Sequence, residues 1–462
     1  MKEWLHMCEH SHVRCKELQK EIRQLPLKCS YLIDVQNMCV SPVDGNQRYF
    51  ALSYVWGQVA NLQLLTKNVA ELSKPSALRC CFEYLPKVIQ DAMTITQELG
   101  ERFLWVDSLC ICQDDPGTKH LQIANMNRIY QSALATLVAV HANDAASGLP
   151  GVKPYQKPRV QHMERIHNMQ MTTLLPDIHN TPSVYSTRAW TYQEEVFSRR
   201  LLYFSNDQVY FRCLKSTYSE DMHEDDPSFP YGRTGQLYGL YPYTEFSWWQ
   251  KTVIEYSTRD YSSEKDRHEA FEGISNELAQ SWNYLCIRGT PIRDFAAALC
   301  WEHSDEKSKR ILLQPSWSWC GWTNGVTFLS NGKLLISRIG TLADVPFINQ
   351  VQPGLDIICR GERSCSSHKI SPAQPLILEF FAYSALIDLV DKDAIIKRDI
   401  ECILIASGVE SGSSPGNLVQ DDYLYVMSID SKGGHCERTG MRKVRRLNFW
   451  EYHPVFRSIY LG

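Results

Sequence analysis

Strand-like and helix-like patterns alternate along the first third of the chain, and this alternation constrains the fold more than any other feature. Apolar runs of strand length occupy residues 48–55, 103–111 and 135–140. The segments 85–99 and 123–133 between them repeat apolar residues at the spacing of a helix that buries one face. An order of strand, helix, strand, helix, strand is typical of a parallel sheet covered by helices. We therefore predict an α/β fold.

The ends of these segments carry matching signals. Pro86 suits the first turn of the helix over 85–99, and Gly100 suits its end. The run Phe103–Ile111 is apolar without alternation, which is typical of a strand that is buried on both faces.

Polar and aromatic residues cluster where the first two strands are expected to end, at Tyr54–Gly57 and Asp107–Asp115. In open parallel sheets, ligands bind beyond the carboxyl ends of the strands. We expect a ligand site at this edge of the sheet.

A later run, Arg188–Glu194, places a tryptophan and a carboxylate one helical turn apart. Trp190 and Glu194 stand at positions i and i+4, so a helix would present both on one face. The same run also fits a capping box, in which Thr191 and Glu194 satisfy the free N–H groups of a first helical turn. Both interpretations of Glu194 remain open from the sequence.

Three blocks, Tyr49–Gly57, Phe103–Asp115 and Arg188–Glu194, together resemble the fungal heterokaryon incompatibility (HET) domain. The resemblance spans residues 30–212, and it includes Leu85-Pro86, Met126–Ala133 and Ser147–Gly151. The HET family is similar, at a distance, to the Toll/interleukin-1 receptor (TIR) domain, in which a glutamate four residues after a tryptophan cleaves NAD. The resemblance implies a TIR/flavodoxin-like parallel sheet flanked by helices, with Glu194 at the catalytic position.

The chemistry that this resemblance implies is cleavage of the bond between ribose and nicotinamide, which yields nicotinamide and ADP-ribose. Glycosidic cleavage passes through a transition state with positive charge on the sugar. An ionised Glu194 would stabilise that charge. NAD is then a substrate, and we expect no metal and no other cofactor, since nicotinamide is already a good leaving group.

Substrate-binding residues are expected around this carboxylate: Ser53, Tyr54, Trp56, Asp107, Gln113, Arg188 and Trp190. Each has a structural alternative. Trp190 would equally suit core packing, Arg188 would suit either a phosphate or a neighbouring element, and Gln113 would suit the cap of the next helix. Trp56 would anchor a tight turn, and a buried Asp107 needs hydrogen bonds whether it is a structural anchor or a site residue.

We therefore predict a non-self-recognition effector that triggers cell death by cleaving NAD. The alternative is a non-catalytic module that self-associates, and a third reading is an unrelated hydrolase using Asp107 or Cys110, with His120 or His141 as the base of the thiol. Self-assembly on activation is expected. The chain has no P-loop and no repeats, so recognition is expected to lie in an upstream protein.

The chain is long enough for more than one compact unit. We predict an N-terminal helical segment (1–30), a HET domain (31–212), an acidic loop or linker (213–245) and an α+β C-terminal domain (246–462), helical first and then mostly β. The tryptophans at 317, 319 and 322 are expected in the core of this last domain.

Composition excludes several classes of function. The net charge is −4 with no long basic stretch, which argues against nucleic-acid binding. The N-terminus lacks a secretory signal and no window approaches about 20 apolar residues, so we expect a cytoplasmic protein without membrane insertion.

The 16 cysteines are expected mostly as small buried residues in a reducing compartment. Cys8, His10, His12 and Cys15 offer four zinc ligands, but they are more crowded than the two pairs of common zinc fingers. We expect this segment to be a helix that covers the sheet.

Overall fold

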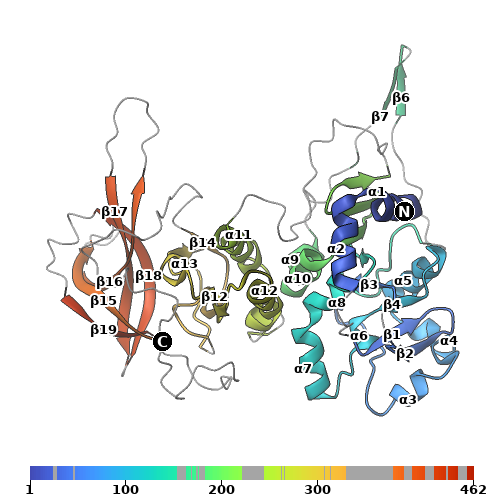
Figure 1. Ribbon diagram of the computed structural model, residues 1–462, viewed down its shortest axis with the longest axis horizontal. Coiled ribbons are helices and arrows are strands. Elements are labelled where there is room, and N and C mark those ends of the chain that lie inside the picture. Colours follow the sequence, from blue (N-terminus) through green and yellow to red (C-terminus); the bar gives the residue numbers. More distant parts are fainter. Residues whose placement is uncertain are drawn as a thin grey trace. The chain divides into compact units, whose positions relative to one another are not determined.

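The computed structural model describes residues 1–23, 29–44, 47–152, 163–167, 169–172, 175, 183–220, 244–328 (apart from 262, 265, 306 and 313), 378–389, 398–410, 421–432, 435–445 and 455–461. The chain forms two compact units, Met1–Pro242 and Tyr243–Gly462 (Figure 1). Most of the predicted linker, residues 221–243, lies outside the described residues.

Unit 1 is built on an eight-stranded sheet in the order β10-β9-β8-β5-β3-β4-β1-β2. Its strands are β1 (Tyr31–Asp34), β2 (Cys39–Pro42), β3 (Tyr49–Ser53), β4 (Phe103–Trp105), β5 (Thr136–Val138), β8 (Arg200–Phe204), β9 (Val209–Cys213) and β10 (Thr217–Ser219). The α/β class is confirmed. The four central strands are parallel, but the prediction of a parallel sheet is wrong at both ends, where neighbouring strands are antiparallel. The short turns after β1, β8 and β9 allow hairpins but no parallel crossover.

Helices cover both faces of this sheet. They are α1 (Lys2–Ser11), α2 (Val13–Arg23), α3 (Val69–Leu72), α4 (Ala77–Cys80), η1 (Phe82–Tyr84), α5 (Lys87–Glu98), α6 (Asp107–Cys110), α7 (Pro116–Ala124), α8 (Met126–Ser132), α9 (Val184–Thr187) and α10 (Ala189–Phe197). Because β4 and β5 lie on opposite sides of β3, right-handed crossovers place α5 and α8 on opposite faces. Helix α10 contacts α8 and lies on the same face (Figure 1). Among the described helices, none has both the length and the apolar composition that a membrane crossing requires.

Two predicted elements are divided in the structure. The strand expected over 103–111 ends at Trp105, because Asp107 starts helix α6 and its carboxylate accepts a 2.7 Å hydrogen bond from the Ser108 amide. The helix expected over 123–133 is interrupted at Asn125, which separates α7 from α8. The helix over 85–99 is confirmed as α5, and Gly100 follows it with φ of +89°.

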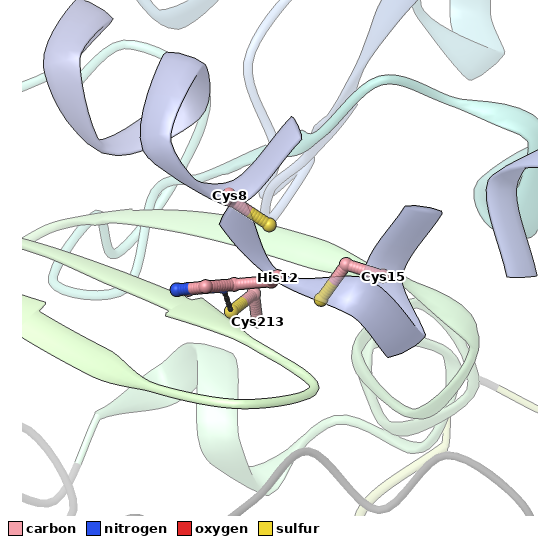
Figure 2. Close-up of side chains that lie close together, drawn as sticks. All are labelled: Cys8, His12, Cys15 and Cys213. Atoms are coloured by element: carbon pink, nitrogen blue, oxygen red, sulfur yellow. Dashed lines mark hydrogen bonds between the residues drawn. The ribbon is translucent and has the colours of Figure 1, made fainter. Parts of the chain in front are cut away.

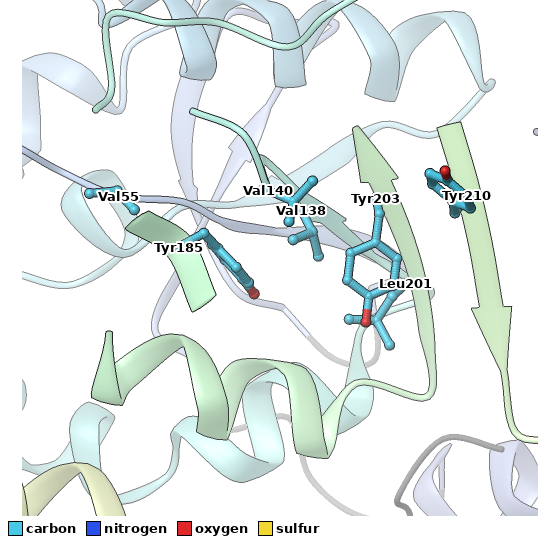
Figure 3. Close-up of a cluster of buried hydrophobic side chains, with 7 residues drawn as sticks. All are labelled: Val55, Val138, Val140, Tyr185, Leu201, Tyr203 and Tyr210. Atoms are coloured by element: carbon cyan, nitrogen blue, oxygen red, sulfur yellow. The ribbon is translucent and has the colours of Figure 1, made fainter. Parts of the chain in front are cut away.

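An apolar cluster fills the space at the carboxyl ends of the central strands. It consists of Val55, Val138, Val140, Tyr185, Leu201, Tyr203 and Tyr210 (Figure 3). Figure 3 shows Tyr185, from α9, reaching toward the side chains of β5 and β8. This cluster lies at the sheet edge where the sequence predicts a ligand site.

Unit 2 begins with helices and ends in a closed barrel of five strands. Its elements are α11 (Glu245–Ser257), α12 (Asp266–Trp282), β11 (Cys286–Ile287), β12 (Thr290–Pro291), α13 (Phe295–Ala298), β13 (Trp301–His303), η3 (Trp319–Gly321), β14 (Val326–Phe328), β15 (Leu378–Leu389), β16 (Arg398–Glu410), β17 (Asp421–Lys432), β18 (His435–Arg445) and β19 (Val455–Leu461). The hairpin β6 (Met163–Ile166) and β7 (Met169–Thr172) belongs to unit 1. Trp317 and Trp319 are fully buried, as predicted for the core of this unit, whereas Trp322 is half-buried.

Candidate functional site

Helix α10 carries Glu194 in its interior and not at its first turn. The helix is preceded by Arg188 at the N-cap position, with no side-chain capping bond. The Thr191 hydroxyl donates to the carbonyls of Tyr185 (2.6 Å) and Arg188 (2.9 Å), so it does not cap α10. The capping-box interpretation is therefore wrong, and the Glu194 side chain is available for another role.

The Glu194 carboxyl lies against the end of β3. It accepts a hydrogen bond from the hydroxyl of Ser53, the last residue of that strand, and it is hydrogen-bonded by Tyr130 of α8. The Tyr185 hydroxyl lies 2.8 Å from Ser53 Oγ. Only 6% of Glu194 is exposed. These contacts hold the carboxyl in one place beside the apolar cluster.

Burial raises the pKa of Glu194 to about 8, and the negative charge of Asp107 acts in the same direction, whereas the bonds from Ser53 and Tyr130 lower it. Removing a carboxylate from water disfavours its charged form. Glu194 therefore carries its proton at neutral pH in the ligand-free protein. The expectation of an ionised Glu194 concerns the complex with NAD, and for that complex it stays a prediction.

A second carboxyl, Asp107, lies at the same edge at the start of α6. Its Oδ2 accepts a 2.7 Å hydrogen bond from the indole nitrogen of Trp56. Desolvation raises the pKa of Asp107 to about 6, although the bonds from Trp56, the Ser108 amide and Tyr54 lower it. The Tyr54 hydroxyl also lies 3.3 Å from Ser108 Oγ. Asp107 thus has the hydrogen bonds that a structural anchor needs, at a position suited to ligand contact.

Gln113 is less free for a ligand than predicted. Its side-chain nitrogen donates to the carbonyls of Asp107 (3.0 Å) and Ile111 (3.2 Å) and so holds the turn after α6. The cap of the next helix is Asp115, which accepts bonds from the amides of residues 117 and 118. The side chain of Gln113 therefore fixes the position of Asp107 through a hydrogen bond to its backbone carbonyl.

Arg188 and Trp190 lie beside Glu194 on the N-terminal side of α10. The charge of Arg188 is close enough to lower the pKa of Glu194. Trp190 is half-buried, one turn before Glu194, and it does not belong to the fully buried core. The side chains of Arg188 and Trp190 are thus partly exposed, whereas the neighbouring Glu194 carboxyl is buried.

The two carboxyls lie where the strand order of the sheet reverses. The chain passes from β3 to β4 on one side and then to β5 on the other, and Ser53 pairs with Val138 at the ends of β3 and β5. Such a reversal opens a crevice that commonly binds ligands in open α/β sheets. Gly57, with φ of +66°, turns the chain away from this edge.

Two residues of the site, Tyr130 and Tyr185, were not predicted from the sequence. Tyr130 and Tyr185 contact the carboxyl network from α8 and α9, and their positions depend on the packing of these helices. Gln193 is 1% exposed, and neither polar atom of its side chain has a hydrogen-bond partner among the described residues. Gln193 precedes Glu194 in α10, but neighbouring residues of a helix point in different directions, so we do not assign this amide to the carboxyl network.

Thiol catalysis at Cys110 has no support in the structure. The thiol is fully buried, and its Sγ lies 3.3 Å from the Val106 amide. Burial raises the pKa of Cys110 well above its ordinary value, so it forms no thiolate at neutral pH. His141 accepts a hydrogen bond from the Asn206 amide, and His120 is exposed.

A pocket of about 340 Å³ lies elsewhere in unit 1, between the β1–β2 turn, η1 and α5. Its walls include Met38, Phe82 and Met93, and none of the predicted site residues. This pocket is separate from the carboxyl network.

Two comparisons with known proteins found similarity, and the family match falls within unit 1. The family model described as heterokaryon incompatibility protein (HET) matches residues 49–194, from the start of β3 to Glu194. The heterokaryon incompatibility protein 6, OR allele, of Neurospora crassa is 30% identical over 138 residues, which are 28% of this chain and 18% of that protein. The chain thus spans less than a fifth of this relative's length. No solved structure matches the chain.

Proposed function

Since this chain is a heterokaryon incompatibility domain protein, with the domain at residues 49–194, we propose that it is an effector of fungal non-self recognition that triggers cell death by cleaving NAD. The family resemblance predicted from the motifs is confirmed. In the proposed reaction, water attacks the ribose carbon that bears nicotinamide, the glycosidic bond breaks, and nicotinamide and ADP-ribose leave.

The arrangement of the central strands supports a TIR-like architecture. The parallel strands lie in the order β4-β3-β5-β8, which in chain order is second, first, third and fourth. This is the order of the first four strands in flavodoxin-like sheets, which bind nucleotides at the reversal between the first and third strands. That position corresponds here to the edge between β3 and β5.

The observation that carries the proposal is the Glu194 carboxyl, held by Ser53 at this reversal. The nicotinamide ring of NAD is cationic, and a nearby positive charge favours the ionised form of a carboxyl. Substrate binding would therefore lower the raised pKa of Glu194 and produce the carboxylate only when NAD is present. This carboxylate then stabilises the positive charge that develops on the ribose.

The remaining predicted residues receive roles around this centre. We assign Trp56 and Trp190, both half-buried, to stacking against the planar rings of NAD, and Arg188 to its phosphates. Asp107, Ser53 and Tyr54 would contact the ribose side of the substrate, and Gln113 would fix Asp107 from behind.

The low exposure of Glu194 favours a second candidate function. With 6% of the residue exposed, the carboxyl of the single chain is closed to a ligand as large as NAD. The domain is then either a non-catalytic module that self-associates, or an enzyme that opens on self-assembly after an upstream protein signals recognition. Of these two, we propose the enzyme that opens on self-assembly, and we propose that it acts in the cytoplasm.

The test measures NAD and nicotinamide by chromatography over a range of protein concentrations and with a crowding agent. Glu194→Gln removes the charge and keeps the size of the side chain, and we expect it to abolish nicotinamide release. Glu195→Gln is the matched control, because Glu195 belongs to a separate ion pair with Arg212 (3.0 Å) and accepts from Tyr203 (2.7 Å). We expect this control to retain release.

Absence of nicotinamide release at every concentration would refute the enzymatic proposal. If the chain still killed cells and Glu194→Gln killed equally well, the self-associating module would be the better explanation. Equal loss of release in both variants would show that folding and not Glu194 chemistry had been changed.

A further inference from the structure

Four side chains that bind soft metal ions come together on the outer part of unit 1. Cys8, His12, Cys15 and Cys213 are all buried, and one potential ligand atom of each lies within 4.8 Å of the other three. Figure 2 shows the three sulfur atoms converging beside the imidazole of His12. We refer to these residues as the Cys3His cluster.

Distant segments build this cluster. Cys8 lies in the last turn of α1, His12 between α1 and α2, and Cys15 in the first turn of α2. Cys213 ends β9 and is 201 residues from His12. The local set considered from the sequence included His10, but this residue is exposed and its Nδ1 lies 2.8 Å from the His6 carbonyl.

We propose that the Cys3His cluster is a structural zinc site. Zinc prefers four tetrahedral ligands of sulfur and imidazole nitrogen. With Zn–S bonds of about 2.3 Å, the sulfurs of such a site lie about 3.8 Å apart, and a sulfur and a nitrogen about 3.5 Å apart. The observed distance between His12 Nδ1 and Cys213 Sγ is 3.3 Å. The other distances between ligand atoms are at most 4.8 Å, so small side-chain rotations would bring all four atoms to the spacing of a zinc site.

Hydrogen-bond donors surround the sulfurs as they do in thiolate sites. The amides of Lys215 and Ser216 both lie 3.4 Å from Cys213 Sγ. Arg200 Nε donates to Cys8 Sγ over 3.0 Å. Three thiolates and a neutral imidazole around Zn²⁺ carry a net charge of −1, and the guanidinium of Arg200, which is 1% exposed, balances this charge.

The imidazole of His12 is also held as a metal ligand would be. Its Nε2 lies 3.3 Å from the hydroxyl of Tyr218 in β10. Metal-bound histidines generally use their second ring nitrogen in such a bond, which fixes the tautomer and the ring orientation. Nδ1 would thus be left to the metal, on the side where it faces Cys213.

The four protein ligands leave no open position for water or substrate, so the site would be structural and not catalytic. It would fasten helices α1 and α2 to the end of β9. The competing arrangement is a disulfide between two of the three cysteines, which would bind no metal and would leave the third thiol and His12 without a shared partner.

The first measurement is the metal content and zinc-edge X-ray absorption of the full chain, purified under reducing conditions from zinc-supplemented culture. We expect about one zinc per chain, with three sulfurs at about 2.3 Å and one nitrogen at about 2.0 Å. A zinc content far below one per chain together with no uptake of Co²⁺ in a tetrahedral thiolate spectrum would overturn the proposal. Zinc bound only by nitrogen and oxygen would overturn it as well.

Variants separate ligation from folding. Cys213→Ser should lose the zinc, whereas Cys29→Ser, which alters a buried cysteine of unit 1 outside the cluster, should keep it. Tyr218→Phe should keep the zinc but bind it about 10–100-fold more weakly in competition with a chelator. Because Cys213→Ser threatens folding, Co²⁺ absorption of the unaltered chain gives an independent count of thiolates. Retention of zinc by Cys213→Ser, or a disulfide within the cluster detected by mass spectrometry, would refute the site.

Discussion

Replacing Glu194 with glutamine should make the protein more stable at neutral pH while it removes the proposed activity. The pKa of Glu194 is raised from an ordinary value of 4.5 to about 8. Between these values the folded state holds a proton that the unfolded state has released, so the free energy of unfolding falls as pH rises. The loss begins near pH 4.5 and is complete above pH 8. Glutamine has no such proton, and the variant therefore lacks this part of the pH dependence.

The magnitude follows from the width of that window. One pH unit corresponds to 1.36 kcal/mol, and neutral pH lies about 2.5 units above the ordinary value of 4.5. The wild-type chain is thus destabilised by about 3 kcal/mol at pH 7 relative to pH 4 through this group alone. We expect Glu194→Gln and wild type to be similarly stable at pH 4 and to differ by about 3 kcal/mol at pH 7.

Chemical unfolding followed by fluorescence and circular dichroism at several pH values measures this difference on the full chain. The two units can unfold separately, so only the transition that responds to variants in unit 1 is compared. Glu195→Gln serves again as the control. It leaves the buried Arg212 without this ion pair and should lower stability by about 1–3 kcal/mol at neutral pH. Parallel pH profiles for wild type and Glu194→Gln would refute the reasoning, since Glu194 would then be ionised in the folded protein.

Two further perturbations address the edge around this carboxyl. Gly57→Ala should lower the free energy of unfolding by about 3 kcal/mol, because the backbone has φ of +66° and an added Cβ would lie 2.5 Å from the Cβ of Asp144. Gly100→Ala is the control: its φ is +89°, but an added Cβ would meet nothing within 4 Å, so this variant should lower the free energy of unfolding by only about 1 kcal/mol. Equal losses in a thermal unfolding comparison would show that the contact is unimportant. Trp56→Phe removes the indole donor to Asp107 and should raise the pKa of that carboxyl above its value of about 6, as measured by carbon-13 NMR titration; an unchanged pKa would contradict the assigned hydrogen bond.

Local sequence patterns predicted the elements whose stability is set locally. The strands β3 and β5 and the helices α5 and α10 follow from apolar periodicity and end signals. The break between Trp105 and Asp107 was not predicted, since the apolar run continues through it and Asp107, the first residue of α6, is its single charged residue. The antiparallel ends of the sheet were also missed, because strand direction is decided by pairing and not by composition.

The candidate site shows the same division. Glu194 was identified from its spacing to Trp190, and Asp107 from its place in an apolar run. Tyr185 and Cys213 were not, because each acquires its role through a partner far along the chain: Tyr185 Oη meets Ser53 across 132 residues, and Cys213 meets His12 across 201 residues. Spacing rules for metal ligands and catalytic pairs apply to neighbours in the chain, so they cannot reach such contacts.

The position of β8 in the sheet determines which fragment of the chain can fold. The matched segment 49–194 contains β3, β4 and β5 but ends before β8, which pairs with β5 in parallel. A fragment trimmed to these bounds would expose the whole edge of β5 and would lose Leu201, Tyr203 and Tyr210 from the apolar cluster. Bare strand edges beside exposed apolar surface invite association with other chains. The segment that the family model matches is therefore smaller than the unit that folds, and aggregation of such a fragment should not be mistaken for physiological self-assembly.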